Sequence, residues 1–120
     1  MKLFRKDDVK LERSSAPLFT GEVDRAMLLD AASSQDFVMS MVHFPPGVRN
    51  KLHTHTSDQI LIVTHGAGIV ATGGEELEVS SGDIVCVPAQ VEHWHGANAT
   101  SDFAHISLVA SSAQTMQLED

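Results

Sequence analysis

Apolar and polar residues alternate over several short stretches of the chain, and glycine, proline and small polar residues separate these stretches. Alternation with a period of two puts successive side chains on opposite faces of a β-strand. The predicted strands cover residues 23–29, 37–44, 59–64, 69–72, 76–79, 84–87, 91–95 and 103–109. Gly73-Gly74 predicts a hairpin, whereas Gly66-Ala67-Gly68 predicts a break. Many short strands without a capped helix indicate an all-β sandwich or barrel.

The chain of 120 residues has the length of a single domain. Residues 1–20 carry mixed charges without a clear period, and we predict an N-terminal arm with at most one short strand, covering the barrel or a partner subunit. Residues 21–110 hold the strands and form the barrel. Residues 111–120 are a polar C-terminal tail, which we expect to fray.

Composition narrows the classes of partner. The formal net charge is −8, which disfavours nucleic acid and anionic membranes as partners. Cys86 is the only cysteine, so no internal disulfide can form. The first residues carry positive charge with no apolar stretch behind them, unlike a signal peptide. We therefore expect a soluble cytoplasmic protein.

Two histidine pairs carry the candidate chemistry. His53 and His55 are separated by one residue, as are His93 and His95, so each pair can share one face of a strand. One interpretation is solvated histidines on polar strands, with Trp94 as the buried residue of the second pair. The other is a transition-metal site built from imidazole nitrogens. Two such pairs in one small β domain favour the metal site.

Two glycine-framed motifs surround these pairs. The first is Gly47-(five residues)-His53-Thr54-His55-(three residues)-Gln59-(six residues)-Gly66. The second is Gly82-(five residues)-Pro88-Ala89-Gln90-(two residues)-His93. In spacing and order they resemble the two cupin motifs, which here cover residues 47 to about 98. Three positions depart from the family: Gln59 replaces the usual glutamate, Gln90 the usual glycine, and Ala97 the usual asparagine.

The resemblance implies a small, jelly-roll-like cupin β-barrel, typically a homodimer. It also implies a divalent transition metal held by His53, His55, Gln59 and His93. A narrower similarity, to the small bacterial cupins that include manganese-dependent hydroxynitrile lyases, extends over Phe19–Val23, Pro46–Arg49, Gln59–Thr64 and His93–Ala97. That group favours manganese, with iron, nickel and zinc as alternatives, and it has a further histidine at the position of His105.

Gln59 has a chemical consequence. Three imidazoles and an amide are neutral ligands, so a divalent ion would keep its full charge and act as a stronger Lewis acid than beside a carboxylate. The substitution therefore favours non-redox chemistry over oxygen activation. His105 alternates with Ile106 and Leu108 onto the other face of its strand. If that face lines the cavity, His105 can act as general base or acid with a pKa matched to neutral pH, and His95 is a second catalytic candidate. The alternative is an outward, solvated His105.

Four functions remain open for a small-molecule substrate. The first is a lyase acting on a small hydroxylated substrate, with cyanohydrin cleavage as the specific hypothesis. The second is an iron-dependent dioxygenase. The third is an isomerase or decarboxylase acting on a small acid or sugar, and the fourth is a binding module without enzymatic activity. His43 and His65 are expected to be surface or structural residues.

Overall fold

Ten β-strands and one short 3-10 helix build the chain in a computed structural model, which describes residues 1–120 except the side chain of Lys6. The elements are η1 (Lys6–Asp8), β1 (Glu12–Ser14), β2 (Val23–Leu29), β3 (Phe37–Phe44), β4 (His53–His55), β5 (Gln59–Thr72), β6 (Glu76–Ser80), β7 (Ile84–Val87), β8 (His93–Ala97), β9 (Phe103–Ala110) and β10 (Thr115–Gln117). The all-β class predicted from the pattern is confirmed. Within the described residues, no helix has the length and apolar character needed to cross a membrane.

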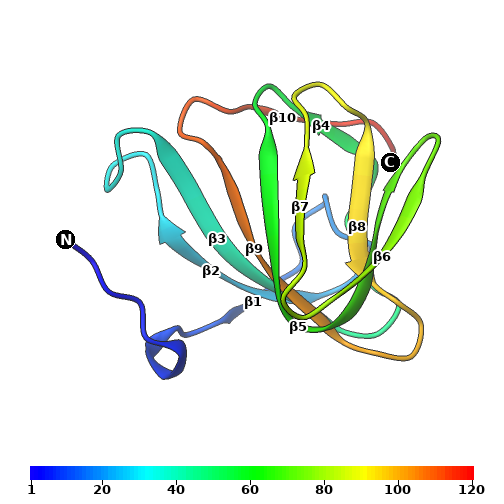
Figure 1. Cartoon of the computed structure of the whole chain (residues 1–120), viewed down its shortest axis with the longest axis horizontal. Coiled ribbons are helices and arrows are strands. Elements are labelled where there is room, and N and C mark those ends of the chain that lie inside the picture. Colours follow the sequence, from blue (N-terminus) through cyan, green and yellow to red (C-terminus); the bar gives the residue numbers. More distant parts are fainter.

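The strands form one curled, antiparallel sheet that folds over on itself into an open barrel (Figure 1). The strand order is β1-β2-β3-β9-β5-β8-β4-β10, and β6 and β7 both pair with β5. The folded sheet forms two walls of the barrel, and the long strand β5 belongs to both. Its first half pairs with β7 and β9, and its second half pairs with β6 and β8. Figure 1 shows the walls converging where β5 bends and diverging at the opposite end.

Glycine allows the bend in β5. The strand has a register shift between Val63 and His65, and Gly66 follows with φ 72°. A Cβ atom on Gly66 would overlap the backbone carbonyl of Asp102, so glycine lets the neighbouring chain approach. The predicted break at Gly66-Ala67-Gly68 is therefore wrong, because the backbone changes direction there without leaving the strand.

Inward-facing apolar side chains fill the narrow end of the barrel. Phe44 and Phe103 are fully buried, with ring centroids 5.9 Å apart, and Phe19 packs edge-on against Phe44 at 5.9 Å. Phe19 lies outside the named strands and forms an isolated bridge with Asn50, so the segment before β2 connects the two walls. Aromatic packing therefore closes this end of the barrel.

Several predicted strands agree with the structure, including residues 23–29, 37–44 and 84–87, which match β2, β3 and β7. The predicted strand at 91–95 begins and ends two residues later, as β8. Residues 1–20 contain the single short strand β1, which pairs with β2. The tail differs from the expectation of fraying, because β10 pairs with β4 in register Thr115↔His55 and Gln117↔His53.

Candidate metal centre

Three histidines converge inside the barrel. His53 and His55 lie on β4, and His93 lies directly opposite His53 on β8. Their nitrogen ligand atoms all fall within 4.8 Å of one another. The residues are buried, with 1%, 8% and 1% exposure. The period-two spacing predicted that each pair shares a face, and antiparallel pairing of the two strands brings the faces together.

Hydrogen bonds on the far side of the rings orient their ligand atoms. His53 Nδ1 lies 2.6 Å from the Lys51 carbonyl oxygen, and His93 Nδ1 lies 2.8 Å from the Val91 carbonyl oxygen. A carbonyl only accepts, so each Nδ1 carries the proton and each Nε2 keeps a free lone pair. His55 Nδ1 lies 2.9 Å from Thr115 Oγ1. His55 Nε2 is buried and has no hydrogen-bond partner. A buried ring nitrogen without a partner is suited to bind a divalent transition metal.

Gln59 completes the cluster from the other wall of the barrel. It is the first residue of β5 and is 4% exposed. Its Oε1 lies 2.9 Å from His93 Nε2, while its Nε2 donates to Ser107 Oγ at 2.8 Å. The structure thus brings together the four residues predicted as ligands, with an amide oxygen facing the imidazoles.

His95 and His105 form a second buried layer. They are 3% and 0% exposed, and His105 Nε2 lies 2.9 Å from His95 Nδ1. The His95 and His53 ring centroids are 5.7 Å apart, so His95 lies next to the triad. Asn50 Oδ1 accepts a hydrogen bond from the His95 backbone N–H at 2.8 Å. His105 therefore faces inward, and the alternative of a solvated His105 does not apply.

Burial sets the protonation of these rings. Desolvation lowers the pKa of His53, His55 and His105 from 6.5 to about 4. Desolvation likewise lowers the pKa of His93 and His95. Neutral imidazoles are the form that binds metals. The expectation of a His105 pKa matched to neutral pH is wrong, because the ring lies deeper than a residue at a cavity mouth would.

The remaining histidines lie outside the cluster. His43 Nε2 is 2.7 Å from Asp102 Oδ2, and His65 Nε2 is 3.1 Å from the same oxygen. Their side chains are 30% and 62% exposed. The Asp102 carboxylate, one residue before β9 begins, links His43 on β3 to His65 on β5, which agrees with the predicted surface or structural role of both histidines.

Sequence reasoning missed most of the residues that support the cluster, and it placed Ser107 on the face of His105 without assigning it a partner. Thr115, Asn50 and Ser107 each contact one of the inner side chains. Glu119, in the C-terminal tail, binds Arg49 at 2.8 Å, and this ion pair lowers the pKa of Glu119 to about 2. The Arg49 guanidinium also lies 4.8 Å from the Trp94 ring centroid. Isolated polar residues of this kind have no periodic signal, so only the folded chain reveals their partners.

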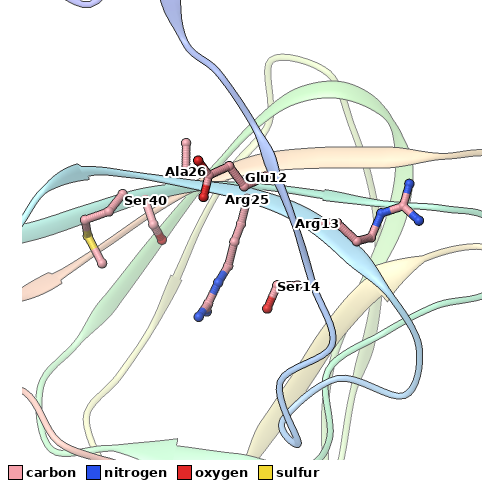
Figure 2. Close-up of a pocket in the computed structure, with 7 residues that line it drawn as sticks. Glu12, Arg13, Ser14, Arg25, Ala26 and Ser40 are labelled. Carbon is pink, nitrogen blue, oxygen red and sulfur yellow. The ribbon is translucent and has the colours of Figure 1, made fainter.

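A depression of about 340 Å³ is lined by residues of β1, β2 and β3 (Figure 2). Arg25, Ser14 and Ser40 extend to the same side of the sheet in Figure 2. Ser40 is the register partner of Ser107 on β9, so one face of the sheet continues from the depression to the partner of Gln59. The lining residues are Glu12, Arg13, Ser14, Arg25, Ala26, Met27 and Ser40.

Comparisons with known proteins agree with this geometry. The chain is 36% identical over 97 residues to the (R)-mandelonitrile lyase of Granulicella tundricola, covering 80% of this chain and 74% of that enzyme. It is 28% identical over 95 residues to an acireductone dioxygenase of Acidiphilium cryptum, covering 72% of this chain and 53% of that enzyme. The chain thus spans about half the length of the dioxygenase.

A solved structure shows the same fold. The crystal structure of a cupin-like protein from Thermotoga maritima superposes with a TM-score of 0.84 at 33% identity, covering 90% of this chain and 84% of that one. The model of the cupin domain family matches residues 40–109, which is more than half of the chain. These residues hold the four candidate ligands and both inner histidines. The chain therefore belongs to the cupin family.

Proposed function

We propose that this cupin is a metal-dependent lyase acting on a small hydroxylated molecule, with a cyanohydrin as the specific substrate. One observation carries the proposal: a buried triad of neutral imidazoles beside a neutral amide, in a chain 36% identical to a mandelonitrile lyase. His53, His55, Gln59 and His93 are the proposed ligands, and manganese is the proposed ion. The bound ion would supply Lewis-acid polarisation of the substrate oxygen.

The inner histidine pair is the proposed proton carrier. His95 and His105 share one hydrogen bond, and burial lowers the pKa of both rings, so both are neutral at pH 7. A neutral ring has a lone pair for the hydroxyl proton, and the lowered pKa makes it a weaker base than a free imidazole. In cyanohydrin cleavage the hydroxyl proton passes to the base, and the carbon–carbon bond breaks with its electron pair leaving on cyanide. The hydroxyl carbon becomes the aldehyde carbonyl, and the proton then passes to cyanide.

Cleavage of mandelonitrile tests this function. Protein loaded with Mn²⁺ is expected to release benzaldehyde, followed by its ultraviolet absorbance, and the His53→Ala variant is expected to lose this activity. His105→Gln is expected to keep metal binding and lose most of the turnover. Equal rates for the wild-type protein and His53→Ala would refute the lyase proposal.

A dioxygenase is the second candidate, because the chain is also 28% identical to an acireductone dioxygenase. Neutral Gln59 argues against it, since no ligand charge would stabilise a more oxidised ion. Substrate-dependent oxygen uptake by iron-loaded protein, together with no cleavage of mandelonitrile, would favour this candidate over the lyase.

We further propose a homodimer. Strand β1 ends the strand order and leaves one edge open, which suits pairing with a second copy. Light scattering during size-exclusion chromatography is expected to give twice the mass of one chain, and the mass of a single chain would contradict this.

A further inference from the structure

We propose that Ser107 is a positioning residue that turns the oxygen of the Gln59 amide towards the metal, and this proposal rests on the proposed metal site. A primary amide has two chemically different ends, and only the oxygen can bind a cation. The residue that satisfies the nitrogen therefore decides whether Gln59 can act as a ligand.

The contacts on either side of Gln59 define this orientation. Gln59 Nε2 lies 2.8 Å from Ser107 Oγ, and Gln59 Oε1 lies 2.9 Å from His93 Nε2. Gln59 is 4% exposed, so its N–H groups have little access to water. Without the Ser107 hydroxyl, an amide turned this way would bury an unsatisfied donor.

The arrangement at His93 points to a cation. His93 Nδ1 is 2.8 Å from the Val91 carbonyl oxygen and must carry the proton. In the neutral ring, His93 Nε2 then offers a lone pair towards Gln59 Oε1, which is also an acceptor. A cation held by both residues would satisfy both lone pairs. Without a cation, rotation of the amide by half a turn would do so, because the Ser107 hydroxyl can donate as well as accept.

Ser107 reaches Gln59 because of the register of β9. It lies two residues after His105 and therefore on the same face of the strand. Its register partners are Ser40 on β3 and Leu61 on β5. Ser40 has a hydroxyl in the same cross-strand row but no hydrogen bond to Gln59 among the described residues, which makes Ser40→Ala a matched control.

The affinity for Mn²⁺, measured by competition with a fluorescent chelator, tests the proposal. Ser107→Ala is expected to weaken binding about tenfold, as loss of a partner that orients a ligand does. Ser107→Thr keeps the hydroxyl and is expected to restore the affinity, and Ser40→Ala is expected to leave it unchanged. In a Gln59→Ala background, Ser107→Ala is expected to have no further effect.

The outcomes separate this proposal from the metal site itself. If the wild-type protein binds Mn²⁺ no better than His53→Ala, the metal site and the Ser107 role are both refuted. If wild-type binding depends on His53 but Ser107→Ala leaves it unchanged, only the Ser107 role is refuted. The same conclusion follows if Ser107→Ala has an equal effect with and without Gln59. The side-chain NH₂ signals of Gln59 in nuclear magnetic resonance, which Ser107→Ala is expected to shift, give a readout independent of activity and of folding yield.

Discussion

We expect acid to unfold the metal-free protein over the pH range in which its buried histidines would take up protons. The pKa of His53, His55 and His105 falls from 6.5 to about 4 because of burial. Below pH 6.5 these histidines bind protons in the unfolded chain but stay neutral in the folded chain. Stability is therefore complete above pH 6.5 and is lost as the pH falls towards 4.

The size of the effect follows from the lowering of these pKa values. A pKa lowered from 6.5 to about 4 corresponds to about 3 kcal/mol for one buried histidine. Three such groups give a loss on the order of 10 kcal/mol, with a slope of roughly 4 kcal/mol per pH unit near pH 5. The pKa of His93 and of His95 is lowered too, which adds loss of the same sign. A loss of this size rivals the total stability of a small domain.

Urea unfolding of chelator-treated protein at several pH values between 7.5 and 4.5 measures this loss. The free energy of unfolding is expected to fall steeply below pH 6.5, and His105→Gln is expected to reduce the slope by roughly 1 kcal/mol per pH unit. Saturating Mn²⁺ is expected to move the fall to lower pH, because protons and the ion compete for the same nitrogens. An unfolding free energy that changes by less than about 1 kcal/mol between pH 7 and pH 5 would refute the reasoning.

Three further changes test the scaffold by thermal unfolding. Gln90 has φ 68°, a left-handed conformation that costs most residues other than glycine about 1–2 kcal/mol. Gln90→Gly is therefore expected to raise the midpoint by a few degrees, and a lower midpoint would contradict this. Gly96→Ala would press a Cβ atom into the backbone of Arg49 and is expected to cost at least about 2 kcal/mol; an unchanged midpoint would show that the two segments separate easily. The Arg49 ion pair lowers the pKa of Glu119 to about 2, so stability from this group is lost as the pH falls below 4.5. Glu119→Gln is therefore expected to lower the midpoint at pH 7, where the buried histidines are neutral and Glu119 is charged, and an unchanged midpoint would exclude the contribution.

The strands that alternate strictly were predictable from sequence. In β3, Val42 and Phe44 are buried, whereas the intervening His43 is half-buried. This alternation identifies the strand period of two and the face that points to the core. The histidine triad was predictable for the same reason, since His53 and His55 are one period apart. Antiparallel pairing of β4 with β8 then places His93 opposite His53.

Other features depend on contacts between distant segments. The three residues of β10 are all exposed, so no apolar signal marks the strand, and its place comes from backbone pairing with β4. Thr115 orients His55 only because that pairing places them opposite each other. The burial of His105 was likewise not predictable from sequence, because its low pKa reflects packing between Phe44 and Phe103.

The candidate metal centre joins the two walls of the barrel, and this placement links its chemistry to folding. The three histidines come from β4 and β8, whereas Gln59 and its partner Ser107 come from the part of the sheet in which β5 pairs with β9. An ion held by all four residues would tie the walls together at the end that diverges in Figure 1, opposite the aromatic packing of Phe44 and Phe103. Neutral rings that favour such an ion are the same rings whose protonation opposes folding. Metal affinity and acid stability therefore depend on one physical cause, the burial of imidazoles without charged partners.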